Sequence, residues 1–176
     1  ICAALGIPVP IETERKFLIR GYFNVSDIPV PREEVMIEQA YLPAPEGEAL
    51  RIRKRNQNDS AVYYHTHKRR LAKEDGTRAF RSVEIERHIS AQEYAELFAL
   101  RAQNLSVIRK KRYCFVWKNQ YFELDAFIEP DPLLQILEVE VTEAQDTVIL
   151  PPFIPIEKEL VNLTNEELAR GDAVLE

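Results

Sequence analysis

Residues 11–17 read Ile-Glu-Thr-Glu-Arg-Lys-Phe, and three charged side chains, Glu12, Glu14 and Lys16, fall on alternate positions. Successive residues of a β-strand point to opposite faces, so these three side chains share one face of a predicted strand. One such strand is common on a solvated surface. The repetition of this pattern along the chain is what decides the fold.

Charge at positions i and i+2 recurs in most segments that have strand character. The positions that share the pattern are Arg51, Arg53 and Arg55; Thr66, Lys68 and Arg70; Glu84 and Glu86; Lys110 and Arg112; Glu123 and Asp125; and Glu138 and Glu140. The intervening positions, such as Leu137 and Val139, are much more apolar. One face of the predicted sheet is therefore charged and the other is suited to packing.

The same patterns predict short strands over most of the chain. The expected strands are Ile11–Ile19, Val35–Tyr41, Ala49–Arg55, Val62–Arg70, Arg81–His88, Val107–Trp117, Gln120–Ile128 and Gln135–Thr142, with a late extended piece at Ile154–Val161. Ser90 and Glu93 form a capping box that predicts a helix over Ala91–Gln103. Thr164 begins a second helix signal near the end of the sequence.

A sheet with this much charge on one face needs compensation. Two like charges about 5 Å apart cost ~3 kcal/mol at an effective dielectric near 20. Acidic strands can lie opposite basic ones, or bound ions can bridge them, and closing the strands into a barrel allows both. We therefore predict a mainly β (α+β) fold, a closed antiparallel eight-stranded β-barrel with flanking helices and a charge-lined interior.

Such an interior suits polyphosphate chemistry. Basic side chains would hold an anion, and paired carboxylates would hold a divalent cation, for which hard oxygen ligands favour Mg²⁺ or Mn²⁺. An anion bridged to carboxylates through such a cation is typical of enzymes that act on phosphate chains. From the residues alone, the prediction is a metal-dependent binder of polyphosphate groups.

Composition limits the binding partners and the cellular location that we expect. The 176 residues carry a net charge of −6, which argues against general nucleic-acid binding. Cys2 and Cys114 are too few for a disulfide framework, so a reducing, cytoplasmic location is expected, and no apolar run is long enough for a transmembrane segment. Pro8 and Pro10 predict that residues 1–10 form an extended linker, while residues 11–176 form the barrel domain.

The order of these motifs resembles the CYTH superfamily, the triphosphate tunnel metalloenzymes, which includes adenylate cyclases of the CyaB type and thiamine triphosphatase. Glu12-Thr13-Glu14-Arg15-Lys16 has the family's Glu-x-Glu-x-Lys form, and Arg51-Ile52-Arg53 resembles its basic third strand. Leu137-Glu138-Val139-Glu140 completes the series, and the resemblance covers roughly residues 11 to 170. The entry into the domain is similar to fusions in which a P-loop, kinase-like domain precedes the CYTH domain, so an upstream P-loop domain is an expected partner.

The resemblance implies a tunnel through which a triphosphate-containing small molecule is threaded. It implies metal ligands at Glu12, Glu14, Glu138 and Glu140. It implies phosphate ligands at Lys16, Arg51, Arg53, Lys68, Lys110 and Arg112. Further tunnel acids are Glu84, Glu86, Glu123 and Asp125, which orient basic side chains or hold a second metal. Lys16 is the expected catalytic base if a lysine serves.

Three functions remain open from the sequence. The first is a divalent-metal-dependent hydrolase of tripolyphosphate or of a nucleoside or thiamine triphosphate. The second is a non-catalytic module that binds a nucleotide or a phosphorylated lipid as part of a larger protein. The third is an adenylate cyclase, which needs the same triphosphate clamp and a base pocket as well. His65 and His67 fall on the opposite face from Thr66 and Lys68, and we expect them to point away from the tunnel.

Overall fold

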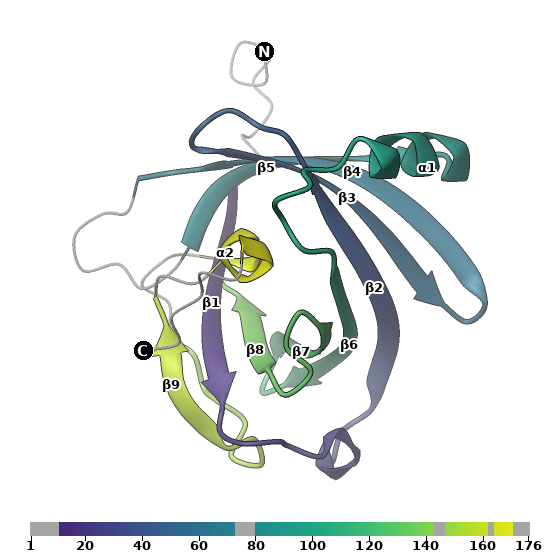
Figure 1. Cartoon of the computed structure of the whole chain (residues 1–176). Coiled ribbons are helices and arrows are strands. Elements are labelled where there is room, and N and C mark those ends of the chain that lie inside the picture. Colours follow the sequence, from purple (N-terminus) through teal and green to yellow (C-terminus); the bar gives the residue numbers. More distant parts are fainter. Residues whose placement is uncertain (1–10, 73–79, 143–146, 162–163, 171–176) are drawn as a thin grey trace.

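The computed structural model describes residues 11–72, 80–142, 147–161 and 164–170. Within these ranges an antiparallel sheet curls into a closed barrel, seen end-on in Figure 1. Its strands are β1 (Ile11–Ile19), β2 (Arg32–Leu42), β3 (Glu48–Gln57), β4 (Ser60–Arg70), β5 (Phe80–Ile89), β6 (Ile108–Trp117), β7 (Gln120–Glu129) and β8 (Gln135–Glu140), with β9 (Ile156–Leu160) added beside β1. The helical elements are the 3₁₀ turn η2 (Val25–Asp27), α1 (Ala91–Ala99) and α2 (Asn165–Arg170).

Neighbours around the ring follow the order β5-β4-β3-β2-β6-β7-β8-β1, and a β5–β1 pairing closes it. The closure is short, running from Ile11 opposite Val83 to Glu14 opposite Phe80. Farther along β1, the same edge pairs with β9 from Lys16 onward. One edge of β1 is thus divided between β5 and β9, while its other edge pairs with β8.

Apolar residues pack on both sides of the wall. On the outer face, Phe17, Leu124 and Leu137 join a cluster that Phe23 and Ile154 cover. These residues alternate with the inward-pointing charged positions of the same strands, as the sequence pattern predicts. On the inner face an apolar cluster lies toward one end of the barrel, where α2 packs its Leu168 and Ala169 into a cluster that includes Leu18, Tyr41 and Ile136.

Helix α1 lies outside the barrel against β3 and β4 (Figure 1). Ser90 caps it by accepting a hydrogen bond from the backbone N–H of Glu93 at 3.0 Å. Tyr94 is the buried anchor of this helix and packs with Ile52 and Ile89. Neither helix in the described residues has the length and apolarity that a membrane crossing requires.

The predicted fold class is confirmed, and the strand predictions correspond to β1 to β9 with shifts at the ends. One boundary is wrong: the helix predicted over Ala91–Gln103 ends at Ala99. The backbone N–H of Leu100 turns back onto the carbonyls of Leu97 and Phe98, and that of Ala102 donates to Tyr41 at 2.8 Å. The chain leaves the helix because it bonds to β2. The predicted linker, residues 1–10, lies outside the described residues.

Candidate functional site

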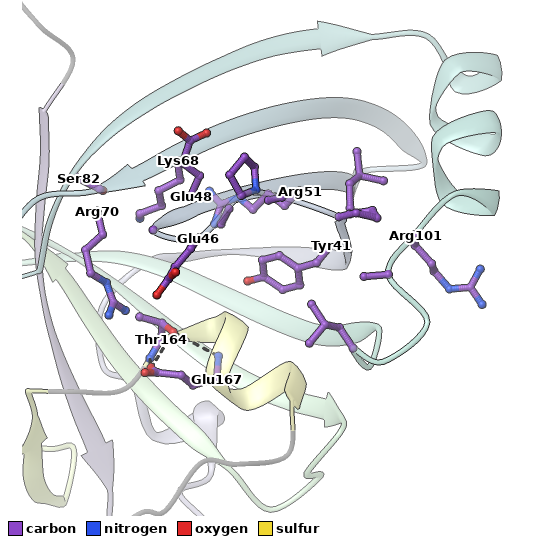
Figure 2. A pocket seen from close by; sticks show the side chains of 18 of the residues that line it. Tyr41, Glu46, Glu48, Arg51, Lys68, Arg70, Ser82, Arg101, Thr164 and Glu167 are labelled. Carbon is purple, nitrogen blue, oxygen red and sulfur yellow. Dashed lines mark hydrogen bonds between the residues drawn. The ribbon is translucent and has the colours of Figure 1, made fainter.

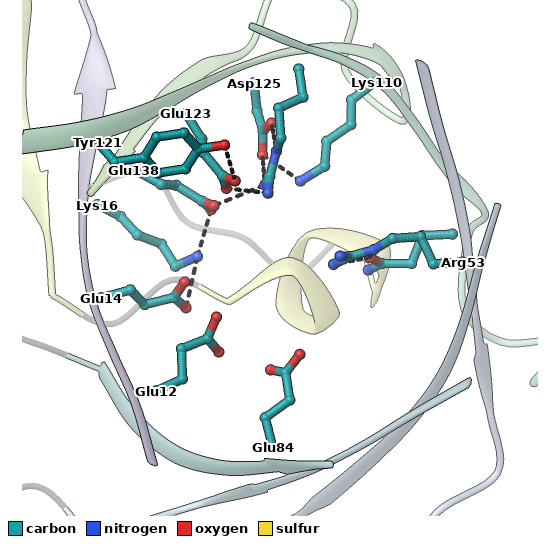
Figure 3. Close-up of polar contacts among 12 residues, drawn as sticks. Glu12, Glu14, Lys16, Arg53, Glu84, Lys110, Tyr121, Glu123, Asp125 and Glu138 are labelled. Carbon is teal, nitrogen blue, oxygen red and sulfur yellow. Dashed lines mark hydrogen bonds and ion pairs between the residues drawn. The ribbon is translucent and has the colours of Figure 1, made fainter. Parts of the chain in front are cut away.

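The inward-pointing charged side chains line the lumen of the barrel, where two cavities meet. Figure 3 looks along the lumen, with Glu12, Glu14 and Lys16 extending inward from β1 and Arg53 from the opposite wall. The narrow cavity measures about 210 Å³ and the wide one about 850 Å³. Glu14, Arg51 and Lys68 line both cavities, so the two adjoin at these side chains.

One side of the lumen is acidic. We call Glu12, Glu14, Glu84 and Glu140 the carboxylate corner; all four line the narrow cavity. Glu14 and Glu140 are register partners across β1 and β8. The Lys68 ammonium lies among these groups, 2.7 Å from Glu12 and 3.2 Å from Glu84. Partial burial and the nearby carboxylates of Glu12 and Glu14 raise the pKa of Glu140, so the corner holds more negative charge than its lysines neutralise.

The chemistry of the corner fits a divalent cation. Its donors are carboxylate oxygens, which suit hard ions such as Mg²⁺ and Mn²⁺. The raised pKa of Glu140 marks the charge that such an ion would neutralise. In the described part of the chain, no three acidic, histidine or cysteine side chains already converge on a metal-ligating arrangement. Lys68 stands between the carboxylates instead.

Basic side chains line the rest of the narrow cavity, and we call Arg51, Arg53 and Arg112 the basic wall. Arg51 on β3 donates to Glu84 at 2.7 Å, and its Nε is buried without a hydrogen-bond partner among the described residues. Arg53 contacts only a neutral amide oxygen, that of Gln39 at 3.3 Å, and makes no ion pair with any described residue. Burial, Arg51 and Arg112 lower the pKa of Arg53 to about 10. Arg53 and the Nε of Arg51 are therefore donors that a bound anion could use.

A buried cluster of ion pairs connects the two sides. Arg112 on β6 binds Asp125 through Nε at 2.6 Å and through Nη2 at 2.7 Å. Its Nη2 also donates to Glu138 at 2.9 Å, and Glu138 accepts from Lys16 at 2.6 Å. Asp125 has no solvent-exposed side-chain surface, and Lys110 forms a further ion pair with it. This chain of contacts fixes Arg112 and Lys16 in the wall.

Lys16, the predicted catalytic lysine, is held as a cation. Burial alone would lower the pKa of Lys16, but Glu138 and Glu14 raise it well above the ordinary value. Its ammonium lies 3.1 Å from Glu14 and lines the wide cavity. In this arrangement Lys16 is suited to binding a phosphate oxygen rather than to accepting a proton.

The predicted site residues therefore divide into two groups. Most of them line one or both cavities: Glu12, Glu14, Lys16, Arg51, Arg53, Lys68, Glu84, Glu86, Arg112, Glu123, Glu138 and Glu140. Lys110 and Asp125 line neither cavity. The Lys110 ammonium is fully buried beside Asp125 and the ring of Phe127. As predicted, His67 points outward, where it contacts Glu48 at 2.7 Å, while Thr66 is buried beneath Glu86.

Sequence reasoning gave no role to Gln39, Arg55 or Tyr121. Gln39 is fully buried and accepts a hydrogen bond from Arg53. The sequence pattern that could have identified it is a polar residue between the inward-pointing Ile37 and Tyr41 of β2. Tyr121 and Arg55 line the narrow cavity. The wide cavity was also missed because loops build much of it. Figure 2 shows Tyr41 pointing into it, and Glu46 and Arg70 near Thr164 and Glu167 of the α2 region.

Known proteins share this architecture. The CYTH domain profile matches residues 10–148. The inorganic triphosphatase NE1496 is 26% identical with a TM-score of 0.55, covering 90% of this chain and 94% of its own. The PH1012 protein of Pyrococcus horikoshii OT3 is also 26% identical, with a TM-score of 0.54 and coverage of 76% and 80%.

A third structure, HpAC1 from Hippeastrum, is described as having a dominant triphosphatase activity. It is 18% identical with a TM-score of 0.57, and the match covers 75% of this chain and 80% of HpAC1. At this identity the similarity supports the fold alone. Among curated protein sequences, none matches the chain. The family match spans most of the barrel, including β1 with its Glu12, Glu14 and Lys16 and β8 with its Glu138 and Glu140. The chain belongs to the CYTH domain family.

Proposed function

We propose that this protein is a divalent-metal-dependent hydrolase of triphosphate compounds. The observation that carries the proposal is the division of the lumen between the carboxylate corner and the basic side chains that face it. Arg53, without a carboxylate partner among the described residues, faces that lumen. The similarity to NE1496, an inorganic triphosphatase, supports the same reaction type.

The basic wall would bind the phosphate chain. Arg51, Arg53 and Arg112 stay protonated at all physiological pH values, so they hold phosphate oxygens without exchanging protons. Lys16 and Lys68 lie between this wall and the acids. They would neutralise the charge that develops on the phosphates as the anhydride bond breaks.

The carboxylate corner would hold the metal ion, through Glu12, Glu14 and Glu140. A divalent cation held there would neutralise charge on the phosphates and would polarise the phosphoryl group that is transferred to water. Glu138 has a different role in this proposal, because one oxygen binds Lys16 and the other binds Arg112. It orients two phosphate ligands. Lys110 and Asp125, which lie behind the wall, support Arg112 in the same way.

The test is release of orthophosphate from tripolyphosphate and from ATP, with Mg²⁺, with Mn²⁺ and with EDTA. We expect release that requires metal and falls at least about 100-fold in Glu14→Gln, since even the residues that orient metal ligands are worth 10–100-fold. The matched control is Glu34→Gln, which removes a carboxylate paired with Lys111 on the outer face at 2.8 Å. Its activity should equal that of the parent.

Two other results would replace the proposal. Release of pyrophosphate from ATP, in place of orthophosphate, would identify a cyclase. Absence of any product, together with a rise in melting temperature on adding tripolyphosphate, would identify a binding module, because a ligand stabilises the folded state without turnover.

A further inference from the structure

The guanidinium of Arg112 is held by carboxylates from two strands. Nε and Nη2 bind Asp125, Nη2 also binds Glu138, and Nη1 forms an ion pair with Glu123. Figure 3 shows Glu123, Asp125 and Glu138 converging on this point of the wall. Arg112 is one of the proposed phosphate ligands, yet an internal carboxylate already occupies its Nη1 donor.

These carboxylates are not equivalent. Asp125 is shared with Lys110 and Glu138 with Lys16, so each bridges two cations. For Glu123, Arg112 is the one cation within ion-pair distance among the described residues. The side chain of Glu123 is also the most exposed, at 24% against 0% for Asp125 and 8% for Glu138. Glu123 is therefore the carboxylate that can leave Arg112 without stranding a second buried cation.

The surroundings of Glu123 weaken its hold. Burial, together with the charges of Glu138 and Asp125, raises the pKa of its carboxyl, and the attraction of Arg112 does not offset them. Tyr121 donates to its other oxygen at 3.3 Å, a long hydrogen bond. Cys114, its register partner on β6, adds no charge that would hold it.

We propose that Glu123 is a stand-in anion: it occupies the Nη1 donor of Arg112 when no substrate is bound, and a phosphate of the substrate replaces it. This inference rests on the proposed function, because it needs the lumen to bind phosphate. Glu123 and Arg112 both line the narrow cavity, so the exchange takes place where a phosphate chain would lie. Glu123 then sets the affinity of the tunnel and helps to expel the product.

The exchange makes a quantitative prediction. A charge-assisted hydrogen bond contributes about 1.5 kcal/mol or more, and substrate binding must break the one that Glu123 makes. Its removal should therefore tighten phosphate binding by about tenfold. An ordinary supporting role predicts the opposite, because loss of Glu123 would then loosen Arg112 and weaken binding.

The experiment compares Glu123→Gln with Glu34→Gln, two variants that remove one negative charge each from an ion pair with β6. The dissociation constant of tripolyphosphate is measured by calorimetry in EDTA, and KM is measured with Mg²⁺. Both should fall about tenfold in Glu123→Gln and stay at the parent value in Glu34→Gln. A second variant, Glu123→Asp, keeps the charge but shortens the reach to Arg112, and its dissociation constant should lie between those of the parent and Glu123→Gln.

Each outcome has one reading. Weaker or unchanged binding in both Glu123 variants, with the parent binding normally, overturns the stand-in anion and leaves the proposed function intact. An equal gain in Glu34→Gln also overturns it, because net charge alone would then explain the effect. Absence of binding and hydrolysis in the parent and in every variant overturns the proposed function, and this inference with it.

Discussion

Glu14 and Glu140 face each other as register partners on β1 and β8, so the barrel sets two carboxylates directly opposite one another. Like charges at opposed positions of an antiparallel pair destabilise the sheet. The opposed carboxylates of Glu14 and Glu140 lower the stability of the empty protein, but they also bring oxygen donors together. This is the arrangement expected at a cation-binding site. The pair therefore connects the stability of the fold to the proposed function.

Glu140→Gln should stabilise the metal-free protein and disable the enzyme. Loss of one of two opposed charges is worth up to about 1 kcal/mol, which corresponds to a rise of roughly 2–4 °C in melting temperature for a chain of this size. Metal-dependent phosphate release should fall at least about 100-fold. Thermal unfolding in EDTA and a phosphate assay check the two halves. A variant that is both less stable and fully active would contradict the assignment.

Arg53→Met should slow phosphate release strongly and leave the fold intact. Among the described residues Arg53 hydrogen-bonds to Gln39, and its burial and repulsion by Arg51 and Arg112 outweigh the attraction of Glu86 and Glu84, so its charge does not stabilise the empty barrel. Loss of one donor to the transition state costs about 10²–10³-fold in rate. Assays of phosphate release and of urea unfolding measure the two effects. Arg69→Met, an exposed arginine on β4, is the matched control and should keep the parent's rate.

Asp125→Asn should be strongly destabilised at neutral pH. Removing one partner of a buried ion pair costs about 3 kcal/mol or more, because the charges of Arg112 and Lys110 are left behind. Burial alone would raise the pKa of Asp125, but Arg112 and Lys110 lower it below the ordinary value. Its stabilisation is therefore complete above about pH 4 and is lost as the pH falls through the lowered pKa.

This prediction is tested by urea unfolding of the parent and of Asp125→Asn between pH 3 and pH 7. The difference in unfolding free energy should narrow below about pH 4. A difference that stays constant over the whole range would show that Asp125 acts through packing alone. Glu93→Gln, which breaks an exposed pair with Arg87, should unfold at the same urea concentration as the parent.

Leu168→Ala should loosen α2 from the end of the barrel. Leu168 is 5% exposed and packs with Leu18 and Ile136, so its truncation should cost about 2–3 kcal/mol if α2 unfolds only with the barrel. Amide hydrogen exchange distinguishes the two ways in which the helix can respond. Faster exchange confined to residues 164–170 means local release, and faster exchange throughout means that α2 is part of the cooperative unit.

The sequence predicted which face each residue occupies, but not how deep along the barrel it lies. Alternation placed Lys110 and Arg112 on the same inner face, and that is where both are found. The two residues are adjacent inward-pointing positions along β6, so they lie at different depths in the barrel. Arg112 reaches the cavity, whereas Lys110 lies toward the apolar end, over the ring of Phe127. Depth depends on the register between strands, and a single strand's pattern does not contain the register.

The features missed by sequence reasoning share a physical cause. The end of α1 was placed too late because residues 100–103 continue a helical pattern, while a hydrogen bond from Ala102 to Tyr41 draws the chain away. The wide cavity draws much of its lining from residues 42–48 and 101–105 together with α2. Contacts between segments so far apart in the chain leave no periodic signal in either one.

The divided edge of β1 also bears on the order of folding. Glu14 pairs with Glu140 on one side and with Phe80 on the other, so β1 has no partner close to it in the chain. The hairpins β3–β4 and β6–β7 can form from local contacts, whereas β1 must wait for strands that the ribosome delivers much later. Folds dominated by such distant pairings reach the native state in milliseconds to seconds. The strand that carries Glu12, Glu14 and Lys16 would thus be among the last to be enclosed, and the lumen would gain its acidic corner only when the ring closes.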